Sequence, residues 1–130
     1  MKQEQKDLLL KDLCSRLPYG VKLLHTPTNE ITNLEMIGNG VIDGNIHDLI
    51  ENFKPYLFPM SSMTEEQKKE YEDALVYHDY VEGGWTIAKL PNDEYFIPSW
   101  FVDFCNKHHL DYRGLLEKGL AIDATGLNIY

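Results

Sequence analysis

The chain has 130 residues, a formal net charge of −9 at pH 7, 43% hydrophobic residues and 25% charged residues. These proportions are typical of a folded globular protein and argue against a disordered chain. Because the surface is acidic and no stripe of Lys and Arg is present, we expect neither direct nucleic-acid binding nor contact with an anionic membrane. No run approaches the roughly 18 apolar residues of a membrane helix, and no signal peptide is recognisable, so we expect a cytoplasmic protein.

The first third of the chain predicts one helix, two strands and a tight turn. Apolar residues spaced by three and four predict a helix over 3–17 that ends at Pro18. Strand patterns follow over 21–25 and 30–37. The segment GNGVIDGN (38–45) carries two turn signals and lacks the lysine and hydroxyl of a phosphate-binding loop. The predicted buried face of the first helix consists of Leu10, Leu13, Cys14 and Leu17.

The middle of the chain predicts two more helices. Apolar spacing over 46–53 predicts a short helix stopped at Pro55, and the proline-containing stretch that follows it, up to residue 62, predicts irregular structure. A longer helix is predicted over 64–77, because Thr64 and Gln67 have the spacing of a capping box.

The last third predicts a β-hairpin, a helix and a looser end. Aromatic and β-branched residues over 85–90 and 94–97 flank a turn, and a helix is predicted over 100–108. Two glycines mark turns around a final short helix over 114–119. We therefore expect one α+β domain over 1–130, with three to four helices packed on a small, mainly antiparallel sheet.

The segment CNKHHLDYRG (105–114) concentrates groups that are capable of chemistry. Helical spacing places Cys105 and His108 on one face, so both could ligate one ion with Asp111. No second cluster with ligand spacing is present, and we predict neither a metal nor a cofactor. A nucleophilic Cys105 is disfavoured, because a reactive thiolate needs an electropositive surrounding. We expect both cysteines, Cys14 and Cys105, to be reduced and buried.

Arg113 is one of only two arginines and suits bidentate recognition of a carboxylate or phosphate. The commoner role is structural, and we expect Arg113 to pair with Asp111 or with helix carbonyls. The candidate binding residues here are His108, Asp111 and Arg113. A small enzyme or metal-binding protein built on Cys105 and these three residues is the alternative function.

An acidic and aromatic surface points to protein binding. Glu66, Glu70 and Asp73 fall within one predicted helix, and Trp85 belongs to a group of aromatic residues near the predicted hairpin. Tyr and Trp are enriched at protein interfaces. We therefore expect a non-catalytic binding or regulatory module with a basic protein partner. A structural or assembly component is a further alternative, and the sequence leaves the oligomeric state open.

Three stretches together resemble a known family: DLCSRLPYGVK (12–22), KPYLFPMSSMTEEQKKEY (54–71) and NKHHLDYRGLLEKGLA (106–121). They are similar to a family of small proteins encoded by gut anaerobic bacteria and by their phages and other mobile elements. No activity is assigned to that family, so the resemblance implies no catalytic residue. It implies an intracellular protein from a mobile-element setting, with a host-directed or regulatory binding role.

Overall fold

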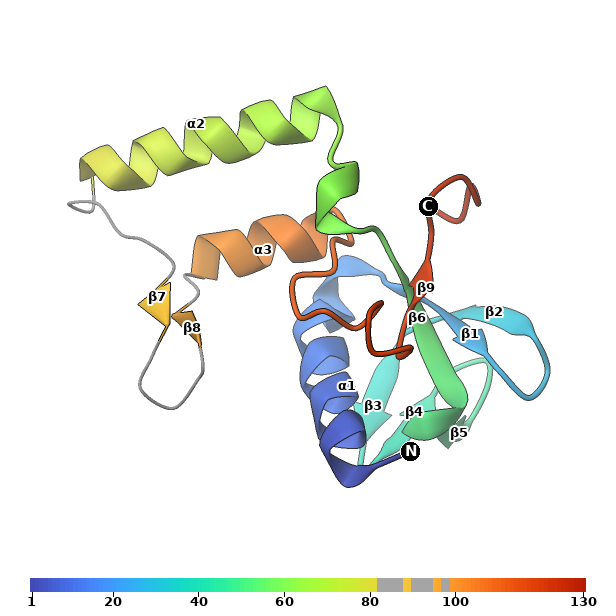
Figure 1. Ribbon diagram of the computed structural model, residues 1–130. Helices are drawn as coiled ribbons and strands as arrows, with labels where there is room; N and C mark the ends of the chain where they lie inside the picture. The colour runs from blue at the N-terminus through green and yellow to red at the C-terminus, as the bar shows by residue number, and fades with distance from the viewer. Residues whose placement is uncertain (82–87, 90–94, 97–98) are drawn as a thin grey trace.

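The computed structural model describes residues 1–81, 88–89, 95–96 and 99–130 and contains three helices, two small, mainly antiparallel sheets and a separate pair of short strands (Figure 1). This architecture confirms the predicted single α+β domain. The helices are α1 (Gln3–Arg16), α2 (Glu65–Val81) and α3 (Ser99–Lys107). The strands are β1 (Lys22–His25), β2 (Glu30–Asn33), β3 (Met36–Gly38), β4 (Val41–Asp43), β5 (Asp48–Leu49), β6 (Phe53–Leu57), β7 (Ala88–Lys89), β8 (Tyr95–Phe96) and β9 (Ile122–Asp123). None of the helices in the described ranges has the length and apolar composition needed to cross a bilayer.

The larger sheet has the strand order β2-β1-β6-β9, and only its β6–β9 pair is parallel. The smaller sheet is the antiparallel series β3-β4-β5. Its first turn is the predicted Asn39-Gly40 pair, with φ angles of 53° and 73°. Two successive positive φ angles define the type I′ turn that matches the twist of paired strands. The paired strands β7 and β8 confirm that the two predicted hairpin segments meet, although the turn between them lies outside the described residues.

The predicted helix over 46–53 is wrong. This stretch instead contains β5, a 3-10 turn at Ile50–Asn52 and the start of β6. Pro55 lies within β6, opposite Leu23 of β1, so the stretch after the predicted helix is not irregular either. The apolar spacing fits a helix, but pairing with β1 and burial of Phe53 decide the outcome. Short apolar runs are ambiguous between the two structures for this reason.

Two further boundaries differ from expectation. The predicted strand over 30–37 is interrupted after Asn33, and its two parts, β2 and β3, join different sheets. The final short helix is also absent: residues 114–119 form turns, in which Gly114 and Gly119 have φ angles of 73° and 71°. Left-handed backbone at both glycines stops a helix from propagating.

Two apolar cores lie side by side. The first core joins α1 to both sheets, and the second core joins α3 to α2 and to the chain after β6. The buried members of the first core are Leu9, Leu13, Val21, Leu23, Leu34, Ile42, Ile50, Phe53, Leu57, Leu115, Leu120 and Ala121. Those of the second core are Phe101, Phe104, Cys105 and Leu110.

The buried face of α1 agrees with the predicted one only in part. It consists of Leu9, Asp12, Leu13 and Arg16, whereas the predicted Leu10 and Leu17 are partly buried against the first core. Cys14 is exposed, which corrects the expectation that both cysteines are buried, whereas Cys105 is buried as predicted. On this face Arg16 Nε lies 2.7 Å from Asp12 Oδ2, and both side chains are fully buried. The buried face thus combines two leucines with an internal ion pair, which apolar spacing alone does not indicate.

Candidate functional site

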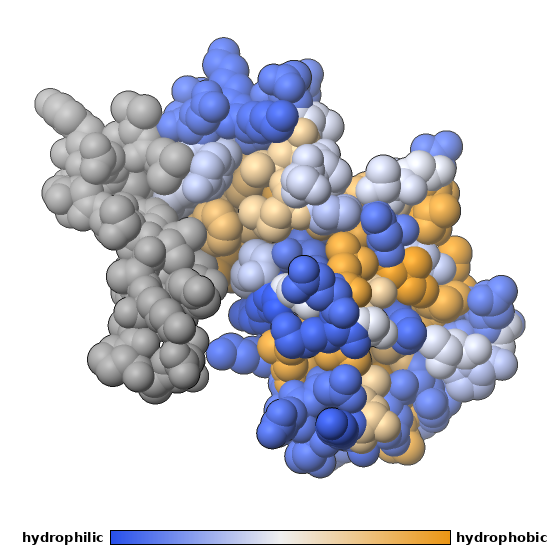
Figure 2. All heavy atoms as spheres, in the orientation of Figure 1, coloured by the Kyte–Doolittle hydropathy of each residue, from blue (hydrophilic) through white to orange (hydrophobic). Residues whose placement is uncertain are grey.

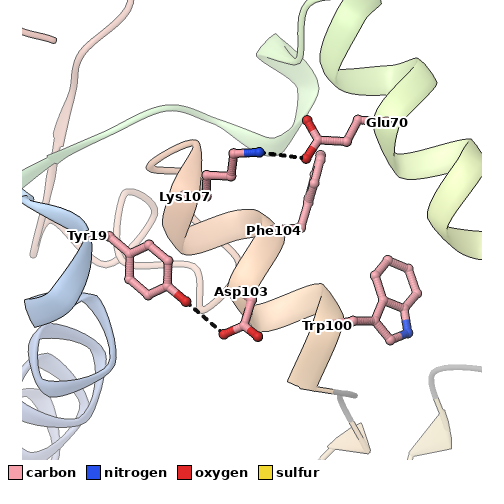
Figure 3. Close-up of a pocket in the computed structure, with 6 residues that line it drawn as sticks. All are labelled: Tyr19, Glu70, Trp100, Asp103, Phe104 and Lys107. Atoms are coloured by element: carbon pink, nitrogen blue, oxygen red, sulfur yellow. Dashed lines mark hydrogen bonds and ion pairs between the residues drawn. The ribbon is translucent and has the colours of Figure 1, made fainter.

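A cleft of about 340 Å³ opens between α3, α2 and the 3-10 turn Leu17–Tyr19 (Figure 3). Four of its lining residues come from α3 and are spaced i, i+3, i+4 and i+7, so they share one face of that helix. Tyr19 from the 3-10 turn and Glu70 from α2 complete the lining. The α3 residues are Trp100, Asp103, Phe104 and Lys107.

Two polar contacts orient the charged groups of the cleft (Figure 3). The Tyr19 hydroxyl donates a 2.8 Å hydrogen bond to Asp103 Oδ1, and this bond raises the pKa of Tyr19. Lys107 Nζ lies 3.1 Å from Glu70 Oε1. The lysine is therefore paired with α2, while the Asp103 carboxylate stays on the exposed surface of α3. Two carboxylates and one ammonium give the lining a formal charge of −1.

Glu70 joins α2 to α3. Its second oxygen, Oε2, accepts a 2.9 Å hydrogen bond from His108 Nε2. Burial opposes ionisation of Glu70, but the bonds from His108 and Lys107 prevail and hold the pKa of this carboxyl below its ordinary value. Tyr71, the next residue of α2, packs against Trp100, Phe101 and Phe104. The structure thus brings together two predicted binding residues, His108 and Glu70, as the junction of two helices.

The other predicted residues of α2 are exposed to solvent. Glu66 and Asp73 are exposed and lie four residues before and three residues after Glu70, so the three carboxylates form one stripe along α2. Figure 2 shows hydrophilic side chains gathered over the outer side of α2 and more apolar ones where α2 meets α3. Trp85, the remaining predicted binding residue of this surface, lies outside the described residues.

Arg113 belongs to a buried polar network and not to an open site. Its Nη1 lies 3.1 Å from Asp12 Oδ1 and 2.7 Å from the Tyr112 hydroxyl. The expected pairing with Asp111 is wrong, because Asp111 instead accepts hydrogen bonds from the backbone N–H groups of Leu115 and Leu116. Asp111 thereby stabilises the turn that follows it, while Arg113 pairs with Asp12 of α1.

The structure does not unite the four residues of the alternative enzyme or metal site. Cys105 is fully buried beside Met60, and burial raises the pKa of its thiol to about 12. A thiol with that pKa stays protonated and is a poor nucleophile at neutral pH. His108 is bound to Glu70, and Asp111 and Arg113 have the separate partners described above. Across the described ranges, no three His, Cys, Asp or Glu side chains are arranged to hold a metal ion.

A hydroxyl–imidazole–carboxylate series forms a second polar site, which the sequence pattern did not reveal. His25 Nδ1 lies 2.7 Å from Thr28 Oγ1, and its Nε2 lies 2.8 Å from Asp48 Oδ2. The bond from His25 lowers the pKa of Asp48, so the carboxylate accepts the Nε2 proton and Nδ1 can accept the threonine hydroxyl. His25 and Thr28 share one turn, but Asp48 arrives from β5, and no local signal links it to them.

Comparison with protein-family models, curated proteins and solved structures finds no match for this chain.

Proposed function

We propose that the protein is a small, non-catalytic protein-binding module that captures a basic partner along α2 and the adjoining cleft. The observation that carries this proposal is the stripe of Glu66, Glu70 and Asp73. Because Glu70 also lines the cleft, the stripe borders it, and acidic and aromatic surfaces are continuous. Complementary charge of this kind gives specificity and speeds association.

The anchoring of α2 supports this role. The helix begins with the predicted capping box, in which Gln67 N donates to Thr64 Oγ1 and Thr64 N donates to Gln67 Oε1. Tyr71 packs α2 against Trp100 and Phe104 of α3, so the helix that carries the exposed carboxylates is anchored. Glu66 and Asp73 are separated by about 10 Å along the axis, the rise of seven helical residues. That spacing suits two or more cations of a basic segment.

The resemblance to a mobile-element family supports a setting for this binding. A protein of phage or mobile-element origin that acts inside its host commonly needs to engage a host or phage protein, and an acidic binding surface serves that purpose. We therefore propose a host-directed or regulatory role for the module within the cell.

The test is binding of a fluorescent, Lys- and Arg-rich peptide, measured by anisotropy across a salt series. The double variant Glu66→Gln/Asp73→Asn is expected to weaken binding and to flatten its salt dependence, because exposed charges act through a screened field. The control variant, Glu4→Gln/Asp7→Asn, removes two exposed acids from α1 and has the same net charge. Equal weakening by both double variants would show that net charge, and not the α2 stripe, is responsible.

A second candidate function is acyl transfer at Thr28, which the Thr28–His25–Asp48 series favours. In this order a carboxylate orients an imidazole, and the imidazole can remove the proton of an attacking hydroxyl. Thr28 is exposed while His25 is only 5% exposed, so the hydroxyl is accessible and the base is held in place.

A fluorophosphonate probe tests this candidate. Attack by Thr28 forms an oxygen–phosphorus bond, fluoride leaves, and His25 takes the hydroxyl proton. Mass spectrometry is expected to locate the label on Thr28, to retain it on Ser in Thr28→Ser and to lose it in His25→Gln. Absence of label from wild-type Thr28, with the neighbouring exposed Thr26 as internal reference, would reduce the series to a structural turn contact.

A further inference from the structure

We propose that the cleft between α2 and α3 is a pocket for one arginine side chain of the partner, with Asp103 as the acceptor of its guanidinium. This inference rests on the proposed binding function and names the group that is recognised. The pocket volume of about 340 Å³ is near the lower end of ligand sites, so it suits a side chain better than a large molecule.

The lining of the cleft is suited to a planar cation. Figure 3 shows Tyr19 and Trp100 on opposite sides of Asp103, while the ring of Phe104 points toward Glu70. Aromatic faces attract cations, and an arginine stacks on them more readily than other charged side chains do. The partly exposed rings of Tyr19 and Trp100 therefore provide a stacking surface, and Asp103 between them provides the counter-charge.

Asp103 is held ready for this contact. Its Oδ1 accepts a hydrogen bond from the Tyr19 hydroxyl at 2.8 Å, which restricts rotation of the carboxylate. A carboxylate has about four lone-pair positions, so one hydroxyl leaves room for the two parallel N–H groups of a guanidinium. Asp103 is exposed, so an incoming side chain can reach it.

Lys107 does not neutralise Asp103. Its ammonium is directed to Glu70, 3.1 Å away, and Figure 3 shows it pointing away from Asp103. Glu70 in turn already accepts one bond on each oxygen, from Lys107 and from His108, so Asp103 remains the recognition carboxylate of the pocket. The net negative lining disfavours phosphate and carboxylate ligands in this pocket.

The experiment is an NMR titration of the isotope-labelled full chain with three blocked tripeptides, Gly-Arg-Gly, Gly-Lys-Gly and Gly-citrulline-Gly. Citrulline has nearly the shape of arginine but no charge. We expect the arginine peptide to shift the Trp100 indole N–H and the amide of Asp103, and to bind at least about tenfold more tightly than the citrulline peptide. The lysine peptide should lie between them. Equal affinity for arginine and citrulline, or shifts centred elsewhere, would overturn the proposal.

Variants connect the binding to Asp103. Asp103→Asn keeps an oxygen for the Tyr19 hydroxyl and should fold normally, yet weaken the arginine peptide about tenfold. Asp7→Asn on α1 removes the same charge from an exposed site away from the cleft and should leave the affinity unchanged. Similar losses in both variants would contradict a specific pocket.

The outcomes separate this inference from the proposed function. If the tripeptides do not bind but the basic peptide still depends on Glu66 and Asp73, the arginine pocket is wrong and the binding surface on α2 stands. If the arginine tripeptide binds at Asp103 while Glu66 and Asp73 have no effect on the longer peptide, the pocket stands and the α2 surface is wrong.

Discussion

Asp12 holds together parts of the chain that are far apart in sequence. It accepts Arg16 from its own helix and Arg113 from the segment after α3. Arg16 also donates to Leu110 O at 2.7 Å, and both guanidinium groups lie over the ring of Tyr112. This network lies at the boundary between the two apolar cores. Removing one partner of a buried ion pair leaves an unpaired charge, which is far costlier than losing a surface pair.

We predict that Asp12→Asn lowers the free energy of unfolding by about 3–5 kcal/mol, because two arginines then lose their counter-charge. Urea denaturation followed by circular dichroism measures the loss. The matched change Asp7→Asn, on the exposed side of the same helix, should alter it by less than about 0.5 kcal/mol. A loss at residue 12 no larger than that at residue 7 would mean that the network contributes little to stability.

At the scale of single elements, local signals agreed with the structure where nearby residues supply the whole interaction. The capping box at Thr64 and the Asn39-Gly40 turn each depend on residues within three positions of each other. The predictions for residues 46–57 were wrong because the strands in this stretch are stabilised by pairing with β1 and β4, which lie elsewhere in the chain. The spacing of apolar residues within a stretch does not show whether a partner strand lies beside it.

The turn between β3 and β4 gives a prediction with a close control. Gly40 has a φ angle of 73° and open space where a Cβ would lie, so Gly40→Ala suffers backbone strain without a clash. We expect a loss of about 1 kcal/mol in thermal or urea unfolding. Gly38→Ala, also in open space but without positive φ, should be nearly neutral. Equal effects would rule out left-handed strain as the cause.

The junction of α2 and α3 gives a prediction about dynamics. Glu70→Gln loses the ion pair with Lys107 and weakens the hydrogen bond with His108, so hydrogen exchange of the amides in residues 65–73 is expected to speed up. Each contact is partly exposed and contributes less than about 1 kcal/mol, so global stability should change little. Glu72→Gln, an exposed neighbour, is the control. Unchanged exchange would show that Tyr71 and its aromatic partners alone hold α2 in place.

At the scale of the whole molecule, the C-terminal residue Tyr130 bonds to two strands of the larger sheet, β1 and β6. The Tyr130 hydroxyl donates to Tyr56 O at 2.7 Å and accepts the N–H of Lys22 at 3.0 Å. The Tyr130 ring stacks on His109, with centroids 3.7 Å apart. Burial, assisted by the charge of Arg16, lowers the pKa of His109 from 6.5 to about 4. The folded protein therefore favours the neutral imidazole.

This pKa predicts how stability depends on pH. Between pH 6.5 and about 4 the unfolded chain binds a proton at His109 that the folded protein does not, so the free energy of unfolding falls as pH decreases through this window. His109→Phe keeps an aromatic ring for Tyr130 and should reduce that slope, whereas His47→Gln at an exposed site should not. The free energy of unfolding is measured by urea unfolding at each pH. If it changes with pH equally in the wild type and in His109→Phe, then His109 is not the source of the pH dependence.

The sequence by itself determined the α+β class, the long helices, the capping box and the type I′ turn, since each depends on neighbouring residues or on a helical period. The helical spacing of Trp100, Asp103, Phe104 and Lys107 is present in the sequence, but nothing there marks these residues as one side of a cleft. Only the tertiary structure decided that Tyr19 and Glu70 complete the cleft and that Arg113 pairs with Asp12 across 101 positions. Such contacts depend on how the two cores pack against each other. The free energy that stabilises them comes from many residues that are far apart in sequence, so no local sequence pattern predicts them.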